Sequence, residues 1–559
     1  MGPYSPVSAL QRGRCLAYEK SENNTMTSGI AVFDNRFARR AVWLASLAAL
    51  AGVSGMAGPA TAATTVGTQW GTVSEPALPT SVCGTVVAQL TPVGGSVDAL
   101  DTTASNAEHD TTRIQDAIAQ CAAGSAVHLI AGTNGQTAFI SGPLTLKSGV
   151  TLWLDKGVTL FASRNPALYD NGIRTCGTAT SSTKKSCNPL INASGTMNAA
   201  IVGDGVIDGR GGSLLTSGPN AGLRTWWDVA YQNKTQGLNQ QNPRLLEVKG
   251  GSNFTLYRIT LQNSPNFHVV TNGVTGVTAW GIKIVTPSAV YTRSGYACPS
   301  GTQPNETTPA TCFTPDTAMN TDGFDPGQSS QVLLAFSYIS TGDDHVAVKS
   351  SASPGVTQLT IAHNHFYYGH GMSIGSETNA GVSDVDVRDL TMDGFDSPNG
   401  NGLRIKSDSS RGGLVTNVRF AQICMRNVAR PLVFNPFYSS TNGTLYPDFT
   451  NIAVQDFHNV GSAKFGGGKV TFSGYEMNGQ HFPLGMTLNN VVFDGTQPTF
   501  EKDVATHYTL GPGAVSFSGS IATSSTNDVA VTGTPGVSTP YDCSAAFTPL
   551  KSVAPTSPI

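Results

Sequence analysis

Hydrophobic and polar residues alternate in many short segments along the middle of the chain. The alternation has a period of two residues, which is typical of β-strands. When the apolar positions of seven such segments are matched, they fall 23 to 55 residues apart, at Phe254, Val277, Val332, Leu359, Val385, Val418 and Ile452. Short strands that return every twenty-odd residues, with loop insertions between them, indicate a right-handed parallel β-helix, whose coils must stack to bury their inner faces. The pattern therefore predicts an all-β fold of this type, with a β-sandwich or a propeller as the structural alternative.

One short helix is indicated before the strands begin. In residues 110–121 apolar side chains recur at helical spacing, and Asp110 or a following threonine can cap the start. We expect this helix to cap the N-terminal end of the β-helix. No linker is indicated before a Ser/Thr/Pro-rich tail that begins near residue 520, so residues 63–559 are predicted to form a single domain.

The first 62 residues predict an exported protein. Arg36, Arg39 and Arg40 precede a short apolar run, and Ala60-Thr61-Ala62 offers a cleavage site. These are the three parts of a signal peptide, and the run is too short for a comfortable transmembrane helix. Met26 would be a more usual start, which makes residues 1–25 a candidate start-site artefact. The pair Arg39-Arg40 leaves a twin-arginine export route open.

Eight of the nine cysteines lie beyond this leader, and an even number in an exported chain predicts disulfides. The sequence alone does not fix their pairing. Local spacing favours Cys176–Cys187, Cys298–Cys312 and Cys83–Cys121, which leaves Cys424–Cys543 by elimination. No C-x-x-C pair or His-rich spacing accompanies them, so no metal site is expected there.

The composition excludes several classes of protein. Charged residues make up 12 % of the chain and 62 residues are glycine, which suits short strands joined by turns better than a helical bundle. The formal net charge of −3 gives no global field that would mark a nucleic-acid or membrane binder. Recognition of a charged substrate must therefore be local. The protein is separately expected to be a monomer.

Carboxylates are sparse in this chain, but several gather near its middle. Asp322 precedes the pair Asp343-Asp344 by 21 to 22 residues, His370 follows Asp344 after 26 residues, and Arg404 follows after another 34. These separations are about one coil each, and strands in successive coils stack at about 4.8 Å. We therefore expect these polar segments to lie one above another along a single face.

Such a cluster has a chemical use. Glycoside hydrolysis needs one carboxylic acid to protonate the leaving oxygen and one carboxylate to activate water or attack directly. Crowded carboxylates raise the pKa of at least one of them, which keeps a proton available. Arg404 and Lys406 alternate with Ile405, so both are expected to point toward the acids, where they suit a substrate with a carboxylate on every sugar. Each motif alone is more often a turn or a solvated surface; their order at one-coil intervals favours the catalytic interpretation.

The set Asn320-Thr321-Asp322, Gly342-Asp343-Asp344, Gly369-His370-Gly371 and Arg404-Ile405-Lys406 resembles the four signature motifs of the glycoside hydrolase family 28 polygalacturonases, and the surrounding residues resemble the endo-acting bacterial members from plant pathogens. The similarity covers roughly residues 80 to 500 and itself implies a right-handed parallel β-helix. It also implies a secreted, extracellular enzyme that hydrolyses the α-1,4-galacturonosidic bonds of polygalacturonate (pectin) with inversion, without a cofactor or metal.

The resemblance also implies a role for each matching residue. Asp343 is expected to be the general acid, and Asp322 and Asp344 the carboxylates that activate water. His370 would keep the acid correctly protonated. The residues expected to bind substrate are Arg404, Lys406 and Tyr438.

The resemblance breaks between Thr286 and Met319, where this chain carries an insertion with Cys298 and Cys312. The insertion enters just before a motif strand and could shape the substrate cleft. Endo cleavage is favoured because no extra N-terminal domain is indicated, and exo cleavage remains the alternative. Further alternatives are a pectate lyase and a non-catalytic β-helix adhesin.

Overall fold

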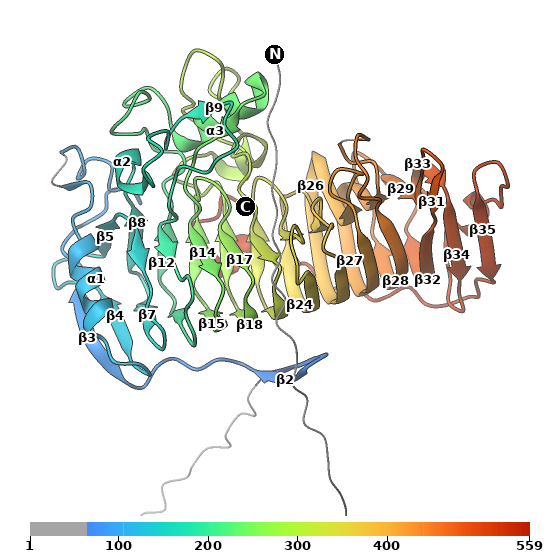
Figure 1. Cartoon of the computed structure of the whole chain (residues 1–559), viewed down its shortest axis with the longest axis horizontal. Coiled ribbons are helices and arrows are strands. Elements are labelled where there is room, and N and C mark those ends of the chain that lie inside the picture. Colours follow the sequence, from blue (N-terminus) through green and yellow to red (C-terminus); the bar gives the residue numbers. More distant parts are fainter. Residues whose placement is uncertain (1–63, 104–105, 440) are drawn as a thin grey trace, which may run out of the picture. The chain divides into compact units, whose positions relative to one another are not determined.

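A computed structural model describes residues 64–103, 106–439 and 441–559; the predicted signal peptide lies outside them. In the described part, the chain winds repeatedly through three parallel sheets, and a typical coil contributes a strand or part of a strand to each sheet (Figure 1). This is the predicted right-handed parallel β-helix, with the handedness usual for parallel crossover connections.

The three sheets have the following strands. The first sheet contains β6 (Leu144–Thr145), β10 (Ile191–Asn192), β14 (Leu246–Lys249), β17 (Val269–Asn272), β20 (Phe324–Gly327), β23 (Val346–Val348), β25 (Met372–Ile374), the ends of β26 (Val382–Lys406) and β27 (Leu414–Asn435), β29 (Lys469–Ser473) and β33 (Thr499–Val504). The second contains β3 (Val82–Val87), β4 (Ala126–Ile130), β7 (Thr151–Leu154), β11 (Ala200–Val202), β15 (Ser252–Tyr257), β18 (Thr275–Trp280), β21 (Ser330–Ala335), the starts of β24 (Val356–Phe366), β26 and β27, then β28 (Asp448–Asn459), β32 (Leu484–Phe493), β34 (Thr506–Leu510) and β35 (Val529–Gly533). The third contains β5 (Ala138–Ser141), β8 (Thr159–Ala162), β12 (Val206–Asp208), β16 (Thr260–Gln262), β19 (Lys283–Val285), β22 (Tyr338–Ser340) and the later parts of β24, β26, β27, β28 and β32.

The seven matched apolar positions confirm the predicted coil register. They are direct neighbours in successive strands of the second sheet, from Phe254 paired with Val277 to Val418 paired with Ile452. All seven are buried in the core that runs along the inside of the stack. A strand period of two places alternate side chains inside, and stacking of the coils buries them against the equivalent residue above and below.

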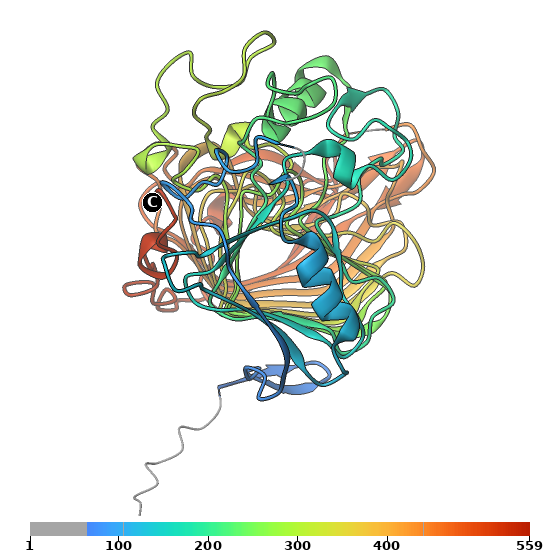
Figure 2. The same cartoon turned by 90° about the vertical axis from the view of Figure 1, so that its left-hand side faces the viewer.

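The predicted N-terminal cap is also confirmed. Helix α1 (Thr111–Gln120) buries Ile114 and Ile118 and packs against β3, β4 and β6, at the end of the stack that faces the viewer in Figure 2. Asp110 occupies the predicted N-cap position, but its side chain makes no cap hydrogen bond. Its carboxylate instead accepts the Ile140 backbone N–H at 2.8 Å, which ties the helix to β5.

A second long helix, α3 (Trp226–Gln236), was not predicted. It begins with a capping box between Thr225 and Asp228 and ends at Gly237, whose φ of 64° is left-handed. The capping residues can be recognised in the sequence. However, Trp226 and Trp227 are both buried, on different sides of the helix, so the segment lacks the single apolar stripe that predicts a helix. Two shorter helices, α2 (Pro166–Tyr169) and α4 (Leu550–Val553), complete the described α-helices.

All four predicted disulfides are present: Cys83–Cys121, Cys176–Cys187, Cys298–Cys312 and Cys424–Cys543. The last one ties the C-terminal tail to β27, and the tail then runs back so that the C-terminus lies beside the middle of the stack (Figure 1). Its end is held by backbone hydrogen bonds from Ala289 to Thr556 and from Gly295 to Pro558. In the residues that the structure describes, no helix is long and apolar enough to cross a membrane.

Candidate active site

The first sheet brings the predicted catalytic segments together in the expected order. Phe324 of β20, Val346 of β23 and Met372 of β25 are paired in register, and Leu403 of β26 continues the row. Asp322, Asp344 and His370 each lie two residues before one of these paired positions, so they occupy equivalent places in three successive coils. This arrangement confirms the one-coil spacing inferred from the sequence.

The three aspartates form a compact group. Asp322, Asp343 and Asp344 each offer an oxygen within 4.8 Å of the others. Asp322 and Asp344 are buried, and Asp343 is half-buried. Since three adjacent negative charges repel one another, their neighbours must compensate the charge.

Asp343 is compensated by His370. The imidazole Nδ1 lies 3.1 Å from Asp343 Oδ1, and the backbone N–H of His370 donates to the Asp343 carbonyl at 2.9 Å. Burial alone would raise the pKa of the Asp343 carboxyl, but the charge and hydrogen bond of His370 hold it well below its usual range. The same partnership raises the pKa of His370, against the effect of its own burial. Both shifts favour the ion pair of a charged imidazole and an ionised carboxylate.

Asp344 is compensated by the basic pair of β26. Lys406 Nζ donates to its Oδ2 at 2.6 Å, Ser373 donates to its Oδ1 at 2.8 Å, and Arg404 Nη1 lies 3.7 Å from the same Oδ1. Ile405, between the two cations, is fully buried in the core. The expectation that Arg404 and Lys406 point together toward the acids is therefore confirmed.

Asp322 is compensated by a residue that the sequence analysis missed. Lys349 Nζ donates to Asp322 at 3.2 Å and to Asp325, a second buried acid, at 2.7 Å. Lys349 follows Val348 of β23 as Lys406 follows Ile405 of β26, in aligned strand positions. Matching the motif strands residue by residue, rather than motif by motif, would have found it.

Burial raises the pKa of Asp322 well above its usual range, and the negative charges of Asp325, Asp343 and Asp344 add to this effect while Lys349 opposes it. Burial likewise raises the pKa of Asp325 to about 6. The predicted rise in the pKa of at least one clustered carboxyl thus falls on Asp322, whereas the pKa of Asp343 is lowered.

Tight backbone packing positions His370. A Cβ atom on Gly369 would lie 2.5 Å from the ring of His345, and one on Gly371 would lie 2.4 Å from the Gly402 carbonyl oxygen. The N–H of Gly371 donates to His345 Nδ1 at 3.3 Å. Burial lowers the pKa of His345 to about 4, so this imidazole is neutral and able to accept that bond. The two glycines of the motif therefore let the His370 loop approach its neighbours.

Tyr438 lies beside the basic pair. The cationic groups of Arg404 and Lys406 are both 5.2 Å from the centre of its ring, and the side chain is 43 % exposed. The aromatic ring thus borders the site from the loop after β27, with its open side available to a ligand.

The three aspartates are the described residues whose ligand atoms are grouped closely enough to hold a metal ion. Each of them already lies against a cationic partner: Lys349, His370 or Lys406. These cations compensate the charge that a metal would otherwise balance, and the expectation that no metal is used stays a prediction.

Comparison with known proteins places this site in a family. Residues 121–508 match the model of the glycosyl hydrolases family 28. A polygalacturonase from Ralstonia solanacearum is 63 % identical over 506 residues, which cover 89 % of this chain and 96 % of that protein. An endo-polygalacturonase from Pectobacterium carotovorum subsp. carotovorum is 42 % identical over 347 residues, or 62 % of this chain and 76 % of that protein. The solved structure of a polygalacturonase from Erwinia carotovora ssp. carotovora aligns with a TM-score of 0.60 and 33 % identity, over 84 % of this chain and 97 % of that chain. The chain therefore belongs to the glycosyl hydrolases family 28.

Proposed function

We propose that this glycoside hydrolase is a polygalacturonase, which hydrolyses the α-1,4-galacturonosidic bonds of pectate. The observation that carries the proposal is the contact of three clustered carboxylates with the basic pair Arg404 and Lys406. The acids supply the chemistry of glycoside hydrolysis, and a guanidinium and an ammonium beside them suit a sugar that carries a carboxylate. The names of the similar proteins agree with this substrate.

In this proposal Asp343 protonates the leaving oxygen. The proton is stored on His370 in the free enzyme, because the pKa of His370 is raised and that of Asp343 is lowered. Substrate binding excludes water from the pair, and loss of water favours the neutral forms of both groups. The proton then moves from the imidazole to Asp343, from which it passes to the leaving oxygen. Arg404, Lys406 and Tyr438 hold the sugar during this step.

Asp322 and Asp344 activate the attacking water in the same proposal, and the anomeric carbon is inverted. The nearest oxygens of the acids lie within 4.8 Å, which is closer than the separation of about 6.5–9.5 Å usual for inverting enzymes. However, both oxygens of Asp344 already accept hydrogen bonds, from Ser373 and Lys406, which makes it a poor covalent nucleophile. NMR of the earliest product distinguishes the two outcomes: inversion releases the β-anomer first, and an initial α-anomer would contradict the single displacement.

Release of reducing sugar from polygalacturonate tests the activity itself. We expect it to proceed in the presence of a chelator and without any unsaturated, ultraviolet-absorbing product. A pectate lyase would form that product and usually requires calcium, and an adhesin would release no sugar. Either result would overturn the proposal.

We also propose that the enzyme is secreted and acts as a monomer outside the cell. Four disulfides support this location, because such bonds persist in oxidising compartments. N-terminal sequencing of the exported protein tests cleavage after Ala62, and its mass in solution tests the monomer.

A further inference from the structure

A polar cavity lies on the first sheet, on the N-terminal side of the acids. Its volume is about 420 Å³, and its floor includes Asn192 of β10 and Glu247 of β14, which are paired in register. The row of paired residues that contains Glu247 continues through Val270 of β17 to Asp325 of β20. Two strand spacings, or roughly 10 Å, therefore separate Glu247 from Asp325, which shares Lys349 with Asp322 of the acid cluster.

The cavity has an excess of positive charge. Its charged lining residues are Lys185, Arg244, Lys249 and Glu247, so three cations face one carboxylate. Arg244 pairs with Glu247 at 3.1 Å. The ammonium of Lys185 forms no ion pair with any residue that the structure describes. Partial burial lowers the pKa of Lys185, and the positive charges of Arg244 and Lys349 lower it further. An anion entering the cavity would relieve that repulsion.

An aromatic ring connects the cavity to the catalytic cluster. The guanidinium of Arg244 lies 5.5 Å from the centre of the Phe267 ring, and Lys349 Nζ lies 4.1 Å from the same centre. Lys349 in turn contacts Asp322. A cation of the cavity and a cation of the active site thus contact the same aromatic ring.

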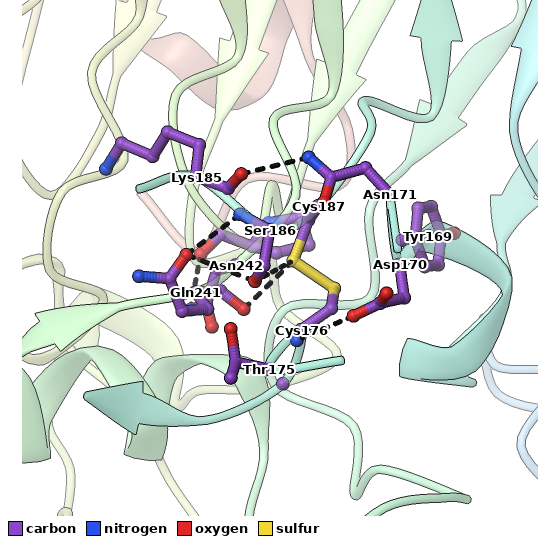
Figure 3. The surroundings of a disulfide bond; sticks show 12 residues. Tyr169, Asp170, Asn171, Thr175, Cys176, Lys185, Ser186, Cys187, Gln241 and Asn242 are labelled. Carbon is purple, nitrogen blue, oxygen red and sulfur yellow. Dashed lines mark hydrogen bonds between the residues drawn. A yellow bond between two sulfur atoms is a disulfide. The ribbon is translucent and has the colours of Figure 1, made fainter. Parts of the chain in front are cut away.

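The loop that carries Lys185 is firmly held. The disulfide Cys176–Cys187 closes it, and Figure 3 shows the side chain of Lys185 extending away from that bond. The carbonyl of Lys185 accepts a hydrogen bond from Asn171 at 2.9 Å. The next residue, Ser186, donates from its backbone N–H and its hydroxyl to Gln241 Oε1, at 3.0 and 3.1 Å. The backbone that carries the Lys185 side chain is therefore fixed by a disulfide and hydrogen bonds.

We propose that this cavity is a further substrate-binding subsite, which receives the carboxylate of a galacturonate unit remote from the cleavage point through Lys185 and Arg244. The amide and hydroxyl groups of its lining, among them Asn188, Asn192 and Gln241, suit the sugar hydroxyls. The inference rests on the proposed polygalacturonase activity and extends it: long chains are bound more tightly than short ones because they reach this second anchor.

A charge reversal with a matched control tests the subsite. Lys184 precedes Lys185 on the same loop and is also exposed, but it does not line the cavity. Lys185→Glu and Lys184→Glu change the net charge equally, so they differ only in where the charge faces. KM and kcat are measured for both variants and the wild type on oligogalacturonates of increasing length.

We expect Lys185→Glu to raise KM roughly tenfold for long oligomers, with a smaller effect on shorter ones and a smaller change in kcat. The difference from Lys184→Glu should shrink at high ionic strength, because salt screens exposed charges. Equal KM values for the two variants, or an increase that does not depend on length, would overturn the subsite. If the wild type itself fails to hydrolyse polygalacturonate, the proposed function is wrong instead, so the two failures are distinguishable.

Discussion

Each of the three clustered aspartates meets a different cation, and this difference separates the roles of three chemically identical side chains. Asp343 faces an imidazole, which can return a proton, whereas Asp344 faces an ammonium and a guanidinium, which keep theirs. Only the first partnership can deliver a proton to a substrate near neutral pH, because lysine and arginine release theirs at much higher pH. The assignment of Asp343 as the acid therefore agrees with its partner as well as with its motif.

Replacement of Asp343 by asparagine should abolish hydrolysis and preserve the fold. The amide is nearly isosteric but cannot transfer the proton, and general acid catalysis contributes about 10²- to 10⁴-fold in rate. Reducing-sugar release and thermal unfolding are measured together. Asp116→Asn, an exposed aspartate on α1, is the control and should change neither. A correctly folded Asp343→Asn variant with near wild-type turnover would end the assignment.

Lys349 should set the acid limb of the pH profile. Its charge lowers the pKa of Asp322, which burial and neighbouring acids raise. Asp322 must be ionised to activate water, so activity is lost as pH falls through its pKa. Without the ammonium that pKa rises, and Lys349→Met should move the acid limb of kcat/KM to higher pH by about one unit or more.

The variant Lys349→Arg keeps the positive charge and should restore most of the wild-type acid limb. A purely structural role for Lys349 would instead lower kcat/KM equally at every pH in Lys349→Met. A profile of unchanged shape would thus show that Lys349 does not act through Asp322.

At the scale of single elements, the strands were the easiest part to predict. Matched apolar positions such as Phe254 and Val277 are direct neighbours in the sheets, because a period of two and obligatory stacking leave little freedom of register. Helix α3 was missed because its two buried tryptophans face different neighbours, Trp226 the main core and Trp227 a separate cluster with Phe313. That cluster depends on a residue far along the chain, which local periodicity does not report.

The site likewise combines features that local spacing predicts with features that depend on residues far apart in the chain. Asp322, Asp344 and His370 could be placed from one-coil spacing alone, since each precedes its strand by two residues at the same register position. Strand register places Lys349 at the position equivalent to Lys406, but its pairing with Asp322 and Asp325 depends on the direction of its side chain, which the sequence does not report. The pKa shifts of Asp322 and Asp343 could not be predicted from the sequence either, because they depend on which cation contacts which acid.

The turn that carries His370 should tolerate no side chain at Gly371. The residue has a φ of 111°, which disfavours any L side chain, and a Cβ would lie 2.4 Å from the Gly402 carbonyl oxygen. We expect Gly371→Ala to lower the free energy of unfolding by about 2 kcal/mol or more and to reduce kcat as His370 shifts. Denaturant titration and kinetics measure the two effects. Gly519→Ala, where a Cβ meets nothing within 4 Å and φ is not positive, should be nearly neutral. Equal stability of both variants would contradict the packing explanation.

For the described molecule as a whole, the position of the acids within the first sheet bears on where a polymer is cut. The acids precede β20 and β23, so β17, β14, β10 and β6 continue the sheet on one side, and β25, β26, β27, β29 and β33 on the other. A chain bound at the acids has sheet surface in both directions. The remaining question is whether the insertion between Thr286 and Met319 blocks one of them.

The insertion packs sideways rather than across the sheet. Phe313 joins Trp227 of α3 in a buried cluster, and Arg224 donates to the carbonyls of Asn305, Glu306 and Thr308. These contacts attach it to the α3 loop, which enters from the same corner between the third and first sheets and lies with it on one side of the stack (Figure 2). The insertion thus adds to a wall beside the site, and we infer endo cleavage.

Endo cleavage predicts that the viscosity of a polygalacturonate solution collapses while few reducing ends have formed, because each internal cut halves a long chain on average. Viscosity and reducing ends are followed in the same sample, together with the sizes of the early products, which should be mixed oligomers. Deletion of the insertion would disturb Trp227, so the wild-type product series is the sharper measurement. Slow loss of viscosity with mono- or digalacturonate as the sole early product would show instead that one direction of the sheet is closed to the polymer.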